Sequence, residues 1–104
     1  MGNYRNRLEI IADILQVASQ NARKTQIMYQ ANLSYKVLKK YLRDLIAASL
    51  ISFETASQLY VITAKGKDFL EAYRDYSKTS KIAEKRISDV NSKKKDLEAL
   101  CENE

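Results

Sequence analysis

The sequence has no proline, no histidine and no tryptophan, and its two glycines are Gly2 and Gly66. So few helix breakers in 104 residues indicate a mainly helical chain with short connections. The missing histidine removes the commonest general base and the commonest zinc ligand. Because Cys101 is the only cysteine, neither an intramolecular disulfide nor a thiolate metal site is expected.

Motifs for catalysis and for membrane insertion are also missing. The sequence has no Gly-rich phosphate loop, no metal-ligand cluster and no recognisable pair of catalytic acids. We therefore expect no enzyme, no catalytic residues, no metal and no cofactor, and no small-molecule substrate is evident. The first residues, MGNYRNRLEIIADIL, lack the features of a signal peptide, and no segment has the apolar length of a membrane span. The expected location is cytoplasmic, without a membrane partner.

The excess positive charge lies in the first half of the chain. The net charge is +5, with eight Lys and Arg against three acids in residues 1–50 and ten against ten in residues 51–104. Residues 21–43 contain no acid, and their basic residues are Arg23, Lys24, Lys36, Lys39, Lys40 and Arg43. A run of one sign in a chain that elsewhere balances its charges indicates a polyanionic partner.

Residues 4–19 have the apolar spacing of an amphipathic helix. The apolar stripe recurs every three or four residues and comprises Leu8, Ile11, Leu15 and Ala18. Three further residues, Ile10, Ile14 and Val17, widen the stripe into a face. This width predicts a well-buried first helix.

A short second helix is predicted before the turn QANLS, residues 30–34. Thr25 is its candidate N-cap. Its apolar positions are Ile27, Met28 and Ala31. Tyr29, like Tyr41 in the next helix, is interpreted as a residue at the edge of the core, with stacking on a nucleic-acid base as the alternative.

The third helix is predicted over residues 35–48, with Ser34 as its N-cap. Its core stripe comprises Leu38, Leu42, Leu45 and Ile46. A second face is basic and comprises Lys36, Lys40 and Arg43 at i, i+4 and i+7, with Lys39 beside them. Such a helix presents one face to the core and the other to a solvated partner.

The periodicity then changes to that of strands. The segments LISFE and QLYVIT are short and rich in β-branched and aromatic residues, with TAS between them. They predict a small β-hairpin. Thr63 is expected to cap the helix that follows, with Gly66 in its first turn.

From Phe69 to about residue 100 the chain follows a heptad pattern. The spacing alternates 4 and 3 through positions 69, 73, 76, 80, 83, 87, 90, 94, 97 and 101, and eight of these ten residues are apolar. A helix of about 37 residues spans roughly 55 Å, which one small domain cannot cover. Burial of each exposed aliphatic side chain is worth on the order of 2 kcal/mol, so a partner helix is expected, most simply from a second copy. The predicted dimerisation residues are Ala83, Ile87, Val90, Lys94 and Leu97.

The order of these elements predicts the fold class. Three helices, a two-stranded wing and a long C-terminal coiled-coil helix make a mainly α (α+β) winged helix-turn-helix protein, with a DNA-binding domain at 1–76 and a dimerisation segment at 77–104. In this fold the third helix enters the DNA major groove. The expected DNA-binding residues are Lys24, Ser34, Tyr35, Lys36, Lys39, Lys40 and Arg43.

The alternative for the basic helix is that its charges only keep an amphipathic helix soluble. The helix-turn-helix spacing, the hairpin that follows and the absence of acids together favour contact with DNA. The wing segment ETASQ carries Glu54 and no basic residue, which argues against a strongly gripping wing.

The segments TQIMYQANLSYKVLKKYLRDLIAASLI and YVITAKGKDFLE, followed by the heptad helix, resemble small archaeal winged-helix DNA-binding proteins of the nucleoid type. The specific part is IMYQANLSY, because ITAKG is shared by many winged helices. The resemblance implies a homodimer joined by an antiparallel coiled coil, with a winged domain at each end. It also implies sequence-tolerant DNA binding and a role in archaeal chromatin or transcription regulation. The acid-bearing wing and the modest net charge depart from this pattern.

The expected function is therefore duplex DNA binding by a homodimer, either architectural and nucleoid-associated or regulatory. Lysine suits phosphate contacts, whereas base recognition favours Arg, Asn and Gln, so low specificity is expected. The alternative from another class is a protein-interaction adaptor that uses the winged domain and the coiled coil without nucleic acid. Salt-dependent binding to DNA distinguishes the two.

Overall fold

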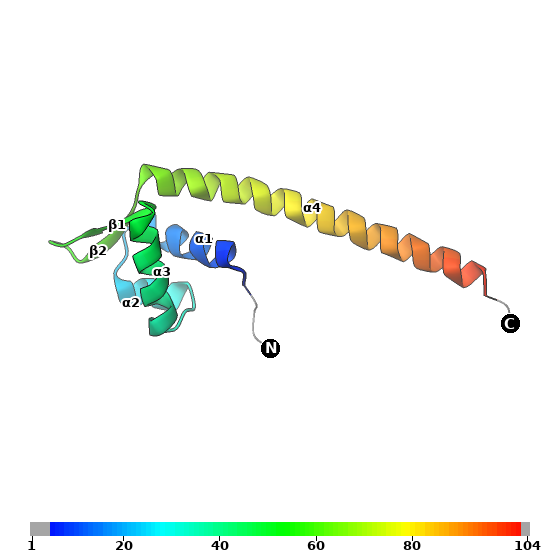
Figure 1. The fold of residues 1–104 in the computed structure, drawn as a ribbon, viewed down its shortest axis with the longest axis horizontal. Helices are drawn as coiled ribbons and strands as arrows, with labels where there is room; N and C mark the ends of the chain where they lie inside the picture. Colours follow the sequence, from blue (N-terminus) through cyan, green and yellow to red (C-terminus); the bar gives the residue numbers. More distant parts are fainter. Residues whose placement is uncertain (1–4, 103–104) are drawn as a thin grey trace. The chain divides into compact units, whose positions relative to one another are not determined.

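The computed structural model describes residues 5–102, and this part of the chain forms four helices and one two-stranded antiparallel sheet (Figure 1). The elements in chain order are α1 (Arg7–Ala18), α2 (Lys24–Gln30), α3 (Tyr35–Ala47), β1 (Ile51–Glu54), β2 (Leu59–Ile62) and α4 (Ala64–Leu100). This order confirms the predicted α+β winged helix-turn-helix with a long C-terminal helix. No helix within residues 5–102 is long and apolar enough to cross a membrane.

Packing divides the chain into two compact units, Met1–Tyr73 and Arg74–Glu104. We call the described part of the first unit the head (5–73) and that of the second unit the arm (74–102). Helix α4 contributes to both units. The predicted division into a DNA-binding domain and a dimerisation segment concerns function and stays a prediction.

Helix α1 begins at Arg7 because Asn6 caps it. The Asn6 side chain accepts a hydrogen bond from the Glu9 N–H (2.8 Å), and Glu9 Oε1 accepts one from the Asn6 N–H (3.3 Å). This reciprocal pair satisfies two backbone donors at the start of the helix. The predicted start at residue 4 lies outside the described residues, and the described helix starts after the cap.

Helix α2 starts at Lys24, so the prediction of Thr25 as its N-cap is wrong. Arg23 occupies the N-cap position with extended backbone and makes no capping side-chain bond. The preceding residue, Ala22, pairs with Tyr60 through both backbone hydrogen bonds, at 3.1 and 2.8 Å. This strand-like pairing fixes where the extended chain ends, and it places the helix start ahead of the residue that propensity alone favours.

The turn between α2 and α3 closes without glycine. Asn32 adopts a left-handed conformation (φ 53°), and the Leu33 N–H donates to the Met28 carbonyl (3.0 Å). This is the Schellman arrangement, in which asparagine substitutes for the usual glycine. Ser34 then caps α3 by accepting a hydrogen bond from the Val37 N–H (3.2 Å), as predicted.

Arg5 ties this turn to α1. Its guanidinium donates to Asp13 Oδ2 (2.6 Å), to the Ala31 carbonyl (2.6 Å) and to the Asn32 carbonyl (2.8 Å). Two carbonyls near the end of α2 are thereby satisfied by a charged donor. Arg5 therefore fastens the turn between α2 and α3 to α1, a role that the apolar spacing of residues 4–19 does not indicate.

The head has one apolar core, to which α1 and α3 contribute most. The buried residues of these helices are Ile11, Ala12, Ile14, Leu15, Ala18, Leu38, Leu42 and Leu45. They confirm the predicted stripes except at two ends, where Leu8 is 41% exposed and Ile46 is 43% exposed. Helix α1 packs on α2 and β2, and α3 packs on β1, so residues at the margins of these contacts stay partly open.

The wing is a regular hairpin. Strand β1 pairs with β2 in the register Ile51↔Ile62, Ser52↔Val61, Phe53↔Tyr60 and Glu54↔Leu59. The Phe53 and Tyr60 rings lie 4.7 Å apart between centroids and are tilted by 47°, a favourable cross-strand aromatic pair. Ile51 and Ile62 are buried and anchor the hairpin to the core.

Gly66, in the first turn of α4, lies against Leu50, which connects α3 to β1. The Thr63 side chain accepts from the Gly66 N–H (3.0 Å), as the predicted cap does. A Cβ at position 66 would overlap the Leu50 carbonyl oxygen and lie 2.7 Å from Ile62 Cγ1. That carbonyl is held by the Thr63 N–H (3.2 Å) and cannot move aside freely. Only glycine allows this approach.

We expect Gly66→Ala to destabilise the protein by about 1–3 kcal/mol, because the added methyl group meets backbone. At an exposed helix position, replacing glycine by alanine has the opposite effect and raises the free energy of unfolding by roughly 0.5–1 kcal/mol. Denaturant unfolding at fixed protein concentration measures the difference. Lys67→Ala, at the exposed next residue, is the control and should change the free energy of unfolding by less than about 0.5 kcal/mol. Equal or greater stability of Gly66→Ala would contradict this explanation.

Candidate nucleic-acid interface

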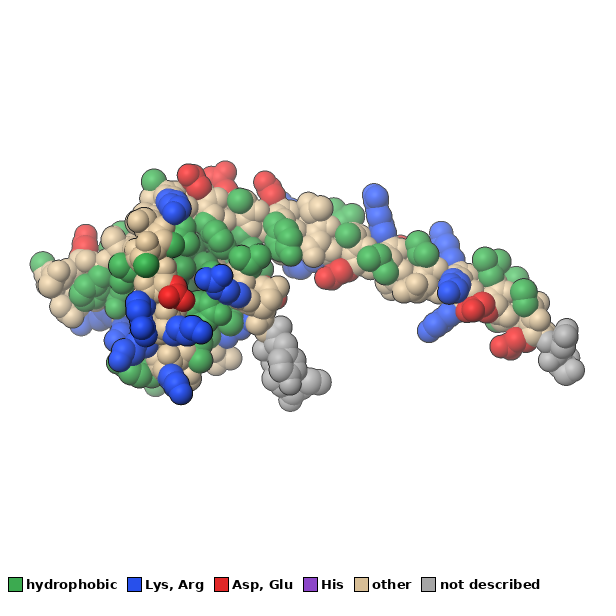
Figure 2. Space-filling model, in the orientation of Figure 1, with side chains coloured by type: hydrophobic (Ala, Val, Ile, Leu, Met, Phe, Trp, Pro, Cys, Tyr) green, Lys and Arg blue, Asp and Glu red, His purple; other side chains and the backbone are tan. Residues whose placement is uncertain are grey.

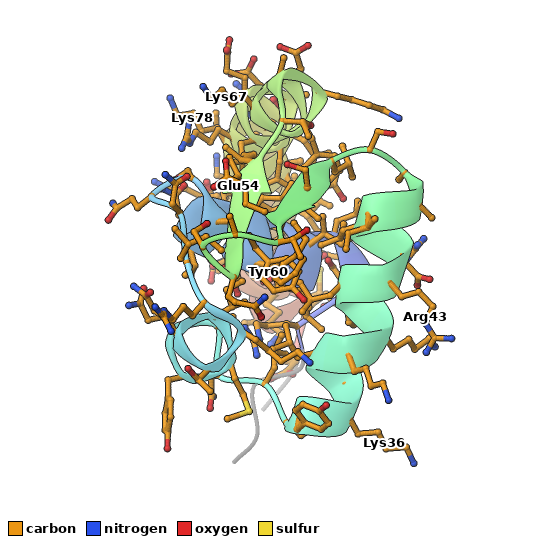
Figure 3. All side chains as sticks on the ribbon, turned by 90° about the vertical axis from the view of Figure 1, so that its left-hand side faces the viewer. Lys36, Arg43, Glu54, Tyr60, Lys67 and Lys78 are labelled. Atoms are coloured by element: carbon orange, nitrogen blue, oxygen red, sulfur yellow. The ribbon has the colours of Figure 1, made fainter. Side chains whose placement is uncertain are left out.

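The basic residues of α3 form one exposed face. Lys36, Lys39, Lys40 and Arg43 are all exposed, while Leu38, Leu42 and Leu45 on the other side are buried. Figure 2 shows Lys and Arg side chains gathered over α3. In Figure 3, Lys36 and Arg43 point to the same side of α3, away from α2. The separation of charge from core matches the prediction.

None of these four basic side chains has a hydrogen-bond or ion-pair partner within residues 5–102. The nearest acid along the helix is Asp44, four residues after Lys40, and the two form no ion pair. Four cations without acidic partners create a positive potential that attracts an anion. The face is therefore available to a polyanion without first breaking internal contacts.

Lys24 joins α2 to the start of α3. Its Nζ lies 4.9 Å from the centroid of the Tyr35 ring and 3.4 Å from Tyr35 Oη. Tyr35 is 53% exposed, so this cation–π contact, worth about 0.5–1 kcal/mol, orients an aromatic side chain at the surface. The Ser34 hydroxyl accepts from the α3 backbone, which leaves its proton able to donate to a phosphate oxygen. The structure thus brings together Lys24, Ser34 and Tyr35 at one end of the basic face.

A hollow of about 290 Å³ lies beside the basic face, between α3 and the hairpin. It is lined by Lys24, Lys39, Leu42, Arg43, Ile46 and Tyr60. Three of the predicted DNA-binding residues therefore border the same space. Ile46 is predicted as a core residue, but it lies at the edge of the apolar stripe of α3, on the side that faces this hollow. Its place at the hollow explains why its side chain is exposed.

A second hollow of about 300 Å³ lies between the start of α2 and the base of the wing. It is lined by Arg23, Lys24, Thr25, Phe53, Gln58 and Tyr60. Arg23 was not among the predicted site residues, although it belongs to the basic run 21–43. Only the pairing of Ala22 with Tyr60 brings it next to the hairpin, and sequence spacing does not reveal that pairing.

The tip of the wing carries no positive charge. Glu54 Oε1 accepts a hydrogen bond from Ser57 Oγ (2.9 Å), and Gln58 Nε2 donates to the Thr55 carbonyl (2.9 Å). Gln58 closes the turn in a left-handed conformation (φ 60°). The side chains of Glu54, Ser57 and Gln58 thus form hydrogen bonds within the turn.

Tyr29 does not lie at the edge of the core, contrary to the prediction. It is 80% exposed, because it lies two residues beyond the buried Ile27 and therefore about 200° around the helix at 100° per residue. Tyr41, in contrast, packs against the core as expected. Tyr29 adds a second exposed aromatic ring to the helix-turn-helix.

The predicted dimerisation residues all lie in the arm. Ala83, Ile87, Val90, Lys94 and Leu97 are exposed in the single chain. Ile87, Val90 and Leu97 keep 61, 64 and 65% of their surface accessible. In contrast, Phe69 and Tyr73, which belong to the head and lie at the start of the same heptad pattern, pack against the head core. Within residues 5–102 no group of three or more acidic or cysteine side chains is placed to hold a metal ion.

Comparison with solved structures shows the same fold in DNA-associated proteins. Sso10a-2, a DNA-binding protein from Sulfolobus solfataricus, is 25% identical in sequence, with 96% of this chain and 100% of that chain covered and a TM-score of 0.68. ZitR from Lactococcus lactis, solved as the wild type in complex with DNA, is 16% identical, with 96% and 79% covered and a TM-score of 0.57. At that lower identity the likeness is one of fold.

The sequence comparisons give a family but no individual relative. No curated protein matches the chain significantly. A family model described as winged helix-turn-helix matches residues 4–81, which includes the whole described head. The chain therefore belongs to the winged helix-turn-helix family.

Proposed function

We propose that the protein is a homodimeric DNA-binding protein that contacts duplex DNA with α3. The observation that carries the proposal is the exposed face of Lys36, Lys39, Lys40 and Arg43, which has no acidic partner within residues 5–102. It occupies the helix that enters the major groove in helix-turn-helix proteins. The description of Sso10a-2 as a DNA-binding protein supports the same function for this chain.

The composition of the face favours binding with little sequence preference. Three of its four cations are lysines, which contact phosphates as point charges and do not form the planar bidentate pairs with guanine that arginine forms. Phosphate contacts fix the position of a protein on DNA but carry no sequence information. An architectural, nucleoid-associated role therefore fits the face better than control of one operator, and the protein acts in the cytoplasm.

The arm supplies the dimer contact. Ile87, Val90 and Leu97 recur at heptad spacing, and burial of each is worth on the order of 2 kcal/mol. The same arm of a second copy repeats this stripe and can bury it as a coiled coil. A homodimer presents two heads, and their linkage raises the apparent affinity for a long duplex.

The two arms pair in antiparallel direction. With a twofold axis between Ile87 and Val90, Ser80 lies opposite the partner's Leu97, so a small side chain faces a large one. The same axis separates Lys94 from its own copy, whereas parallel helices would place two Lys94 ammonium groups in one core layer.

Charges beside the heptad stripe favour the parallel direction, but weakly. Arg86 and Lys93 face one another across an antiparallel pair, while a parallel pair brings Lys93 near the partner's Glu98. Exposed pairs of this kind contribute about 0.2–1 kcal/mol, less than one buried apolar side chain. The core layers therefore outweigh the flanking charges.

The first test removes charge from α3. Lys36→Ala/Lys40→Ala should weaken binding to two unrelated duplexes about equally and reduce the slope of log K against log salt by roughly 2, since each lost phosphate contact contributes about 0.9. The control, Arg7→Ala/Lys67→Ala, removes the same charge from α1 and from the start of α4 and should leave the slope nearly unchanged. Unaltered binding by the α3 variant would remove this helix from the interface. Salt-independent or absent binding by the wild type would favour the adaptor function.

The second test places charge on the heptad stripe. Ile87→Asp/Val90→Asp should convert the dimer to a monomer in sedimentation at micromolar concentration, because it buries carboxylates in the coiled-coil seam. Ser88→Asp/Ser92→Asp adds the same charge on the outer side of the same helix and should stay dimeric. A wild-type chain that sediments as a monomer would refute the dimer.

The third test concerns the direction of the coiled coil. In the antiparallel pair the two Cys101 residues are roughly 37 Å apart, since Cys101 lies opposite the partner's Tyr76 at 1.5 Å per residue. Mild oxidation should therefore leave the wild-type dimer without an efficient internal disulfide, because bridging needs Cα atoms within about 7 Å. Tyr76→Cys, which adds a thiol opposite the partner's Cys101, should cross-link. Rapid Cys101–Cys101 bridging in dilute wild type would show parallel helices.

A further inference from the structure

The two hollows in the head adjoin, because Lys24 and Tyr60 line both of them. Together they make up the space beside α3, the start of α2 and the base of the wing. In Figure 3, Tyr60 lies between α2 and α3. We call this space the wing-base groove. Its cationic lining residues are Arg23, Lys24, Lys39 and Arg43.

The wing-base groove is strongly positive. Its four cations come from the start of α2 and from α3, and no acidic side chain is among the residues that line it. Arg23 and Lys39 make no hydrogen bond or ion pair within residues 5–102. A cleft lined by charges of one sign focuses its field and concentrates counter-ions. An anionic occupant would relieve the mutual repulsion of these side chains.

The form of the groove suits a polymer backbone better than a small molecule. Small-molecule pockets bury most of their ligand, whereas these two hollows are open to the surface and have two or three cations each among their lining residues. Lys39 and Arg43 belong to the groove and also to the basic face of α3. One DNA strand that follows the basic face of α3 can therefore continue into the groove and stay close to positively charged side chains along its path.

The wing tip offers no comparable contact. It presents Glu54, whose carboxylate accepts from Ser57, and its described residues 55–58 carry no cation. A phosphate brought to the tip would meet a carboxylate, which repels it. The hairpin therefore meets DNA better at its base than at its tip.

We propose that a phosphodiester backbone of duplex DNA lies in the wing-base groove, where Arg23 and Lys24 hold it beside Tyr60, while the wing tip stays clear of the DNA. This inference rests on the proposed DNA-binding function and adds to it a second contact region and the path of one strand. Arg23 is the residue that distinguishes it from contact through α3 alone.

The test compares salt dependence for single substitutions in the full-length chain, with two unrelated duplexes as probes. Arg23→Gln should lower affinity several-fold at moderate salt and reduce the slope of log K against log salt by about 0.9, the value for one phosphate contact. Arg7→Gln, an equal charge change at an exposed position of α1, is the matched control and should leave the slope unchanged. Thermal unfolding of each variant checks that the head remains folded.

Ala56→Lys tests the wing tip. It adds one cation at an exposed turn position and should change affinity by less than twofold, because no phosphate lies within reach. An increase of the slope by about 0.9 would place the tip on the DNA and overturn the inference. An unchanged slope for Arg23→Gln would also overturn it. If Lys36→Ala/Lys40→Ala still weakens binding in that case, the proposed function survives and only the groove contact is lost.

Discussion

The surface of the head depends on the backbone pairing between Ala22 and Tyr60. The two hydrogen bonds of this bridge fasten the connection between α1 and α2 to the wing, so two segments far apart in the chain meet at one place. The bridge sets the first residue of α2 and brings Arg23 and Lys24 beside the hairpin. Backbone hydrogen bonds can hold these two segments together with almost any side chains, because every residue except proline has a backbone N–H and C=O. The positive charge of the surface can therefore vary while the arrangement stays.

Helix α3 shows how one short element satisfies two opposed demands. Its leucines at spacings of four and three residues bury one side, and four cations occupy the opposite side. Placing the cations together raises their mutual repulsion, and burial of Leu38, Leu42 and Leu45, worth roughly 2 kcal/mol each, offsets it. The Ser34 cap and the Arg5 contacts fix the start of the helix without using any of the exposed cations. The buried leucines of α3 thus stabilise the fold, and different residues of the same helix provide the exposed positive charge.

Local patterns were sufficient to predict the elements, and contacts across the chain account for what they missed. The cap at Ser34, the hairpin and the continuous helix to Leu100 follow from residue types at fixed spacing, and all were predicted. Thr25 is predicted as the N-cap of α2 because capping propensity is a local property, whereas Arg23 occupies that position because the preceding residue, Ala22, pairs with β2. For the same reason the sequence does not predict the roles of Arg5 and Arg23, since each lies beside a segment that is distant in sequence. Ile46 fits the apolar spacing of α3 but lines the groove and is partly exposed. The spacing identifies which side of the helix is apolar, but it does not indicate how much of that side other elements cover.

The heptad pattern runs through α4 without a break, yet its residues serve two purposes. Phe69 and Tyr73 stack with ring centroids 6.4 Å apart and pack against the head core, so the first part of the stripe is satisfied within the chain. From Ala83 to Leu97 the residues of the stripe are exposed within residues 5–102. In the proposed dimer this second part of the stripe would be buried between two arms, while the first part stabilises each head. One uninterrupted heptad pattern therefore predicts a helix correctly along its whole length but does not indicate which of its apolar residues are covered within the chain and which need a partner.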